Sequence, residues 1–437
     1  MKPCEIKTVK ARQVYDSRAN PTVEVDIILA EGTLGRGMVP SGASTGKFEA
    51  LELRDGGESW NGKGVLKAVE NVNTVLGPAL IGMDASEQKA IDQKLIELDG
   101  TPGKSRLGAN AILGCSIAAC WAAANYRREP LYRYLGGTLA NTIPVPMVQI
   151  IGGGAHANMA IDIQDFLVIP LSASSFTSGY EMIVNVYNAA KKVFTEQGKP
   201  LAVADEGGFW PSGFHNNEEG IALLTESIRK AGYNPGRDIA IALDIASSEF
   251  YNEQDGTYRL TLENRSLDRT AFIDLLCGWV EKYPIISLED GASELDWEGT
   301  KLLTERLGKK IQLIGDDLFT TNIQRIKKGV SMGCGNSVLI KMNQIGTISE
   351  TMEAIAYTKQ HGYLPVVSAR SGETEDCTIV HLAIATNAGQ LKVGSAARSE
   401  RTAKWNEIIR IEEALGNCAC YPSDTIFTDA GIAIYNR

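Results

Sequence analysis

The sequence has 437 residues, a length that allows two or three ordinary domains or one large α/β barrel with a smaller domain. Hydrophobic residues make up 44% of the chain and charged residues 22%, proportions that are ordinary for a globular protein and give no sign of disorder. The net charge of −10 argues against a protein built to bind nucleic acid, although a few local cations can still hold an anionic substrate.

The cysteines and the first residues indicate the compartment. Eight cysteines are scattered without CxxC pairs, and residues 1–18 carry charges throughout instead of an apolar signal segment. We therefore expect free thiols in a cytoplasmic protein without a membrane span. The long uncharged run at residues 107–126 is rich in alanine and predicts a buried helix, and the run at residues 134–161 is interrupted by prolines. A metal or redox role for the CxC pair of Cys418 and Cys420 has only weak support from the sequence.

The first part of the chain mixes strand and helix patterns. Residues 8–15 and 21–30 predict two paired strands joined by the polar turn DSRAN. Residues 63–76 place their large apolar side chains on one face at helical spacing, which predicts a helix. We expect residues 1–138 to form a small α+β domain that ends in the proline-containing segment LGGTLANTIPVPM.

Residues 139–437 have a different sequence pattern. Short apolar runs end in polar residues and alternate with helical segments. The runs that predict strands are IQDFLVIP, PLAVADEGG, IAIALDIASSEF, IISLEDGA, IQLIGDD, SVLIKMNQ, YLPVVSARSG and GQLKVGSAARSE. Apolar runs of this kind are typical of parallel strands buried on both faces. The alternation with helices predicts an α/β fold, a (β/α)8 barrel.

Charged residues stand at or near the ends of six predicted strands: Asp244, Glu289, Asp316, Lys341, Arg370 and Lys392. In a barrel of this kind the active site lies at the carboxyl ends of the strands. Any one of these residues can cap a helix or form an ion pair, but burying six charges together without a ligand or metal would be costly. The sequence therefore predicts one charged site at the mouth of the barrel.

The three carboxylates among them come from consecutive strand ends: Asp244, Glu289 and Asp316. Hard oxygen ligands without a nearby histidine or cysteine favour Mg²⁺ over Zn²⁺, so we expect a magnesium site. Lys341 and Lys392 flank this group, and a lysine can act as a general base when neighbouring positive charge and burial lower its pKa. The alternative is that both lysines are salt-bridge partners of the carboxylates.

Three further segments are ambiguous by themselves. Glu206 precedes a glycine pair in ADEGGF, and in an extended segment only one of Asp205 and Glu206 can face a pocket. The segment SGASTG at residues 41–46 can be a flexible turn. His156 in GGGAH can be a hydrogen-bonded structural histidine.

Taken together, the motifs resemble those of the enolases (phosphopyruvate hydratases). SGASTGKFEALELRD, ADEGGF, LDIASSEFY, SLEDGASELDW, GDDLFTTN, LIKMNQIGT, RSGETED and ARSERTAKWNEIIRIEEALG follow the enolase series in order and cover nearly the whole chain. The resemblance implies an enolase-type barrel at residues 139–437, preceded by the α+β domain. It also implies a cytoplasmic, magnesium-dependent hydro-lyase of glycolysis and gluconeogenesis that converts 2-phosphoglycerate reversibly to phosphoenolpyruvate. Glu24 and Arg410 match positions that pair across the family's dimer interface, which implies a homodimer or a higher homo-oligomer.

The resemblance further implies a role for each site residue. Lys341 resembles the base that takes the C2 proton, and Glu206 resembles the acid that assists the loss of the C3 hydroxyl. Ser41 resembles the loop residue that joins the second of two Mg²⁺ ions when the loop closes. The residues that resemble the ligands of the first Mg²⁺ are Asp244, Glu289 and Asp316. The residues that resemble substrate contacts are His156, Asp165, Arg370, Ser371, Lys392 and Ser41.

Four positions depart from the enolase pattern. Ala369 stands where histidine is usual, and Asp165 is one methylene shorter than the usual glutamate. Gly152 replaces the usual asparagine before the loop histidine, and Ala19 replaces the usual glycine of DSRAN. The first three lie where the phosphate and C3 groups of the substrate are expected.

Two catalytic functions therefore stay open. One is the ordinary enolase reaction. The other is the dehydration of a related phosphorylated or phosphonate hydroxy acid by an enolase-like paralogue, such as a carboxyphosphonoenolpyruvate synthase. A non-catalytic surface-binding protein on the same scaffold is disfavoured, because Lys341, Glu206 and the three metal-ligand carboxylates are all retained.

Overall fold

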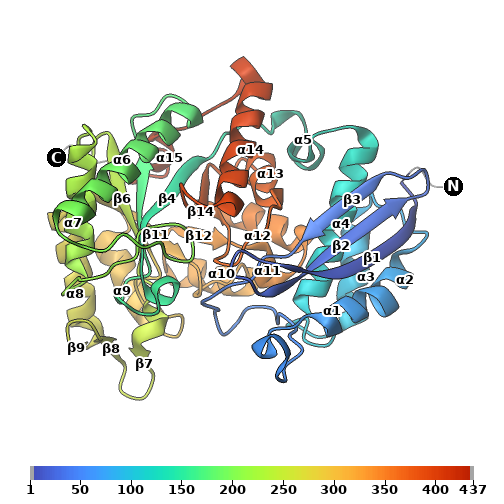
Figure 1. The fold of residues 1–437 in the computed structure, drawn as a ribbon, viewed down its shortest axis with the longest axis horizontal. Coiled ribbons are helices and arrows are strands. Elements are labelled where there is room, and N and C mark those ends of the chain that lie inside the picture. Colours follow the sequence, from blue (N-terminus) through green and yellow to red (C-terminus); the bar gives the residue numbers. More distant parts are fainter. Residues whose placement is uncertain (1–3, 434–437) are drawn as a thin grey trace.

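A computed structural model describes residues 4–433, with a small sheet domain packed beside a closed barrel (Figure 1). The sheet domain begins with the antiparallel strands β1 (Ile6–Tyr15), β2 (Pro21–Leu29) and β3 (Leu34–Met38). The first two are the paired strands that the sequence predicts. In the turn between them, Ala19 has a φ of 59°, a conformation that glycine adopts at lower cost.

The helices of this domain cover one region of the sheet. They are η1 (Ser59–Gly62), α1 (Leu66–Asn71), η2 (Val72–Leu76), α2 (Gly77–Leu80), α3 (Gln88–Asp99), α4 (Ala109–Arg127), α5 (Leu131–Gly136) and η3 (Gly137–Leu139). The predicted helix at residues 63–76 corresponds to α1 and η2. The predicted buried helix corresponds to α4, which packs on β2 and β3.

The close approach of α4 to the sheet depends on glycine in β3. A Cβ atom at Gly35 would lie 2.1 Å from the carbonyl oxygen of Ala118, and one at Gly37 would lie 2.7 Å from the Cβ of Ile117. Small residues on both surfaces let the backbones meet, which explains why α4 is rich in alanine.

Eight strands form the barrel and confirm the predicted fold class. They are β4 (Val145–Gly152), β5 (Asp165–Pro170), β6 (Ile239–Asp244), β10 (Ile285–Glu289), β11 (Gln312–Gly315), β12 (Ser337–Ile340), β13 (Leu364–Ser368) and β14 (Gln390–Ser395). They close in the order β10-β11-β12-β13-β14-β4-β5-β6. Their inward side chains form an apolar core that includes Met147, Leu167, Ile286, Leu339 and Val366.

One barrel strand runs against the others, which the sequence pattern did not predict. β5 pairs antiparallel with both β4 and β6, whereas the remaining neighbours pair in parallel. Asp165, the first residue of β5, is therefore in register with Gly152 and Asp244, the last residues of β4 and β6. The reversal brings the start of β5 to the end of the barrel where the other strands finish.

One predicted strand was wrong. The run PLAVADEGG forms a loop with isolated bridges from Phe209 to Ile151 and Val203, and the side chains of Leu201 and Val203 are 46% and 50% exposed. The eighth strand is β4, which the sequence interpretation had placed in a domain boundary because of its prolines. Pro146 lies near the start of β4 and is fully accommodated in the buried strand.

Helices surround the barrel (Figure 1). The longer ones are α6 (Phe176–Glu196), α7 (Glu218–Lys230), α8 (Arg269–Lys282), α9 (Trp297–Leu307), α10 (Ile323–Met332), α12 (Ile348–Gln360), α13 (Thr378–Ala385) and α14 (Ser399–Leu415). Shorter elements are η4 (Gly154–Ala157), η5 (Ser247–Phe250), α11 (Met342–Ile345), η6 (Gly416–Cys418), α15 (Thr425–Thr428) and a small sheet of β7 (Tyr251–Asn252), β8 (Thr257–Leu260) and β9 (Arg265–Leu267).

Across residues 4–433, the helices are too short or too polar to cross a membrane.

Candidate active site

The predicted metal-ligand carboxylates stand at the carboxyl ends of neighbouring strands. Asp244 and Glu289 are the last residues of β6 and β10 and are in register with each other, and Asp316 follows β11 directly. All three are buried. Gln164 donates a hydrogen bond to Asp244 at 3.0 Å, and Gln344 donates one to Asp316 at 2.8 Å.

Two lysines supply the counter-charge of these acids. The Nζ of Lys392 lies 2.8 Å from both Asp244 Oδ2 and Glu289 Oε2. Burial by itself would lower the pKa of Lys392, but the charges of Asp244 and Glu289 raise it well above its usual range. Lys341 forms the corresponding ion pair with Asp316, and this charge likewise raises the Lys341 pKa against the opposing effect of burial. The lowered pKa that the sequence analysis expects of such a lysine is therefore not found, and both lysines form the ion pairs that it gives as the alternative.

By its chemistry the predicted donor set suits a magnesium ion, although the ligand atoms of Asp244, Glu289 and Asp316 do not all lie within 4.8 Å of one another in the described part of the chain. One oxygen of Glu289, Oε1, is buried without a hydrogen-bond partner among the described residues. Burial, and then the charge of Asp244, raise the pKa of Glu289 well above its usual range, and an added cation would offset both effects. Three carboxylates without a soft ligand are the donors that Mg²⁺ prefers.

A second acidic group lies directly beside this one. Ligand atoms of Asp290, Asp316 and Asp317 come within 4.8 Å of one another. Burial, followed by the charge of Asp316, raises the pKa of Asp290 to about 8. The Asp290 carboxylate accepts the backbone N–H groups of Asp316 and Asp317 at 2.9 and 2.8 Å, so it holds the end of β11 in place.

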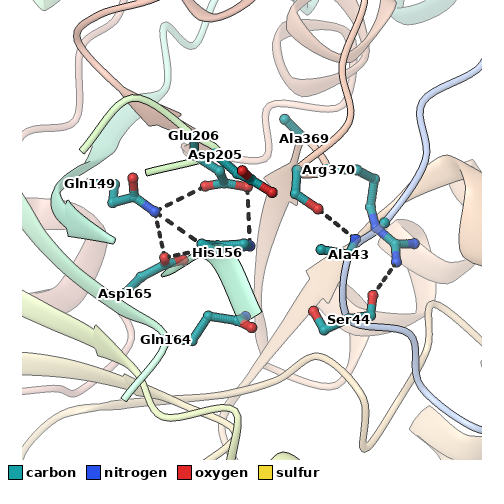
Figure 2. A network of polar contacts seen from close by, with 12 residues as sticks. Ala43, Ser44, Gln149, His156, Gln164, Asp165, Asp205, Glu206, Ala369 and Arg370 are labelled. Carbon is teal, nitrogen blue, oxygen red and sulfur yellow. Dashed lines mark hydrogen bonds and ion pairs between the residues drawn. The ribbon is translucent and has the colours of Figure 1, made fainter. Parts of the chain in front are cut away.

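Glu206 belongs to a cluster with His156 and Asp165 (Figure 2). The Glu206 side chain is buried, whereas that of Asp205 is 42% exposed, so the residue that faces inward is Glu206. His156 Nδ1 lies 2.9 Å from Asp165 Oδ1, and its Nε2 lies 3.7 Å from Glu206 Oε1. Burial would lower the pKa of His156, but the charges of Glu206 and Asp165 raise it to about 9. The ring is therefore a cation near neutral pH.

The loop at residues 41–46 reaches the arginine that follows β13 (Figure 2). Arg370 pairs with Glu49 at 2.9 Å and donates to the carbonyl oxygen of Ser44 at 2.9 Å. The backbone N–H of Ala43 donates to Ser371 Oγ at 2.6 Å. The loop is thus held over the site by hydrogen bonds to Arg370 and Ser371.

Ser41 takes a different position from its neighbours in the loop. Its hydroxyl lies 3.0 Å from Glu52 Oε2 and accepts from Arg54 at 2.9 Å, while its backbone pairs with Gly372. The loop residue that lines the central cavity is Ser44.

The cavity enclosed by these groups measures about 20 Å³, close to the space of one water molecule. Its walls include predicted site residues from the start of β5, the ends of β6, β12, β13 and β14, and the loops: His156, Asp165, Glu206, Asp244, Lys341, Arg370, Ser371 and Lys392. Glu289 and Asp316 lie behind this wall, joined to it through Lys392 and Lys341. Ala369 also lines the cavity.

Sequence reasoning missed one central residue. The Gln149 side chain contacts Asp165 and Glu206, yet the start of its strand had been assigned to a boundary segment and the strand itself was not predicted. A lone glutamine in an apolar run carries no motif, so only the recognition of β4 as a barrel strand would have indicated it.

Comparison with known proteins agrees with this geometry. A model of the enolase N-terminal domain matches residues 6–135, and a model of the enolase C-terminal TIM barrel domain matches residues 140–430. Enolase 1 of Desulfitobacterium hafniense (strain Y51) is 72% identical over 432 residues, which cover 99% of each chain. With both domain models matched and the charged barrel mouth in place, the chain belongs to the enolase family of hydro-lyases.

Proposed function

We propose that the chain dehydrates 2-phosphoglycerate reversibly to phosphoenolpyruvate with Lys341 as the base and Glu206 as the acid. Lys341 takes the proton from C2, and the electron pair left behind becomes the C2=C3 double bond. The C3–oxygen bond breaks, and the proton of Glu206 joins the departing hydroxyl to form water. The reverse reaction uses the same two residues with their roles exchanged. The enolase reaction is a step of glycolysis and gluconeogenesis.

The identity over the full chain supports the enolase reaction against the paralogue alternative. The three departures at Ala369, Asp165 and Gly152 are therefore variation within an enolase site. A carboxyphosphonoenolpyruvate synthase is set aside as the identity of this chain.

The observation that carries the assignment is that Lys341 and Glu206 line one cavity together with Lys392 and Arg370. A base, an acid and two buried cations around one small space are what proton removal beside a carboxylate and a phosphate requires. We assign Lys392 to the substrate carboxylate, and Arg370 and Ser371 to the phosphate. His156 and Asp165 complete the wall around the C3 side.

We assign two Mg²⁺ ions to the site. Asp244, Glu289 and Asp316 would hold the first, and Ser41 would join the second. Bound magnesium supplies positive charge that stabilises the ene-diolate formed when C2 loses its proton. Closure of the loop at residues 41–46 over the bound substrate would exclude water, which strengthens each electrostatic contact inside.

The remaining expectations concern the whole protein. We propose a cytoplasmic homodimer or higher homo-oligomer with a small phosphorylated substrate, no nucleic-acid partner and a domain boundary between residues 138 and 139. The exposed Arg410, now paired with Glu407, is available to a second copy of the chain.

Steady-state kinetics test the substrate. With Mg²⁺ present, we expect kcat/KM for 2-phosphoglycerate to fall in the range of about 10⁴–10⁸ M⁻¹s⁻¹ found for enzymes on their own substrates. A kcat/KM more than tenfold below that range, with magnesium binding intact, would contradict the proposal. A titration of Mn²⁺ as a paramagnetic probe would count the ions per site, and we expect two.

A further inference from the structure

The amide of Gln149 lies between the two carboxylates of the His156 cluster (Figure 2). Gln149 is the fifth residue of β4 and is fully buried. Its Nε2 lies 2.5 Å from Asp165 Oδ1 and 3.3 Å from Glu206 Oε2, and its Oε1 accepts the backbone N–H of Gly208 at 3.0 Å. A backbone N–H can only donate, so this bond fixes the amide with its NH₂ group towards both acids.

Two glycines make space for the Gln149 amide oxygen. A Cβ atom at Gly208 would lie 2.5 Å from Gln149 Oε1. A Cβ atom at Gly152 would lie 2.8 Å from the Cβ of Ala204 and 3.1 Å from Gln149 Oε1. Real Cβ atoms avoid contacts as short as the one at Gly208, so a larger residue there would displace the glutamine amide. At Gly152 a Cβ atom would clash with Ala204 and would press on the amide oxygen.

The side chains of Gln149 and Asp165 have complementary lengths across the space between β4 and β5. Aspartate at position 165 extends one methylene less than glutamate would, and the long glutamine at position 149 reaches across to it. His156 closes the cluster, because its Nδ1 faces Asp165 and its Nε2 faces Glu206. The two oxygens of Glu206 therefore have separate partners, His156 at Oε1 and Gln149 at Oε2.

We infer that Gln149 is a positioning residue for the acid Glu206, and that Gly152 and Asp165 are the residues that make room for it. This inference rests on the proposed function, in which Glu206 acts when the C3–oxygen bond breaks. Gln149 does not line the cavity and touches no reacting atom. Its effect falls on the second half of the reaction, after Lys341 has removed the C2 proton.

The test compares two rates in each variant with saturating Mg²⁺: exchange of the C2 proton with D₂O, and formation of phosphoenolpyruvate. Glu206→Gln sets the reference and should suppress product formation far more than exchange. Gln149→Leu, which keeps the volume and removes the amide, should lower product formation about 10- to 100-fold while exchange changes less than threefold.

A length swap keeps the inference testable if Gln149→Leu folds poorly. Gln149→Asn withdraws the amide by one carbon–carbon bond, roughly 1.5 Å. Adding Asp165→Glu restores the lost length from the other side. We expect Gln149→Asn alone to be impaired and the double variant to recover at least half of the lost turnover.

Gln312 offers a matched control, because it is another fully buried barrel glutamine, at the opposite end of the strands. It is the first residue of β11, and its Nε2 donates to Gln390 at 2.6 Å and to Ser337 at 2.9 Å. Gln312→Leu should lower the melting temperature without changing the ratio of exchange to product formation.

The outcomes separate the two claims. If Glu206→Gln lowers both rates equally, the assignment of Glu206 fails, and the inference about Gln149 fails with it. If Glu206→Gln separates the rates but Gln149→Leu does not, the inference alone is overturned. A double variant no better than the product of its two single effects would also overturn it.

Discussion

Two lysines divide the three metal-ligand carboxylates between them, and this division decides what a single substitution does. Asp316 holds Lys341, whereas Asp244 and Glu289 share Lys392. The sequence predicted these five residues, together with Arg370, as one group because they stand at or near the ends of predicted strands. It could not predict how the charges divide, since that depends on the register between strands and on side-chain direction.

Replacing Asp316 tests the metal assignment. Asp316→Asn exchanges one of three charged oxygen ligands for a neutral amide, so we expect the Mg²⁺ concentration for half-maximal activity to rise at least about tenfold. Titration of activity against Mg²⁺ measures this directly. An unchanged midpoint would show that Asp316 is not a ligand.

The charge of His156 predicts a pH dependence of stability. Its pKa is raised to about 9 in the folded chain by Glu206, Asp165 and, more weakly, Asp244, against an unfolded value of about 6.5. A raised folded pKa gives stability that is fully present below pH 6.5 and is lost as the pH rises through 9.

Urea unfolding at pH 6 and pH 10 without metal measures this contribution. Between pH 6 and pH 10 the free energy of unfolding should fall more in the wild type than in His156→Gln. The difference between the two falls should be at most about 3 kcal/mol. An equal fall in both proteins would mean that His156 is uncharged in the folded state.

At the scale of elements, the barrel was predictable from apolar runs that end in charges, but two of its features were not. β5 runs antiparallel, and no local pattern records strand direction. β4 was missed because Pro146 suggested a boundary, while Leu201 and Val203 of PLAVADEGG proved to be exposed. Both features matter for function, since they place Asp165 and Gln149 in the site.

The packing of α4 on β3 predicts a sensitive position. Gly35→Ala would bring a methyl group within 2.1 Å of the Ala118 carbonyl oxygen and force the helix away from the sheet. We expect a loss of about 1–3 kcal/mol in the free energy of unfolding. Gly103→Ala, where a Cβ atom meets nothing within 4 Å, is the control and should change stability little.

At the scale of the whole molecule, the proposed dimer predicts a mass twice that of the 47.2 kDa chain. Sedimentation equilibrium measures it. Arg410 is exposed and its ion pair with Glu407 is open to solvent, so Arg410→Glu should shift the protein towards monomers without unfolding it. A wild-type mass of one chain at micromolar concentration would contradict the proposed assembly.

The central claim is that Lys341 removes the C2 proton, and deuterium exchange at C2 tests it most directly. In Lys341→Ala with saturating Mg²⁺, exchange should fall by roughly 10²–10⁴, the usual contribution of a positioned base, while magnesium binding measured by calorimetry stays largely intact. Exchange at the wild-type rate in this variant would contradict the account.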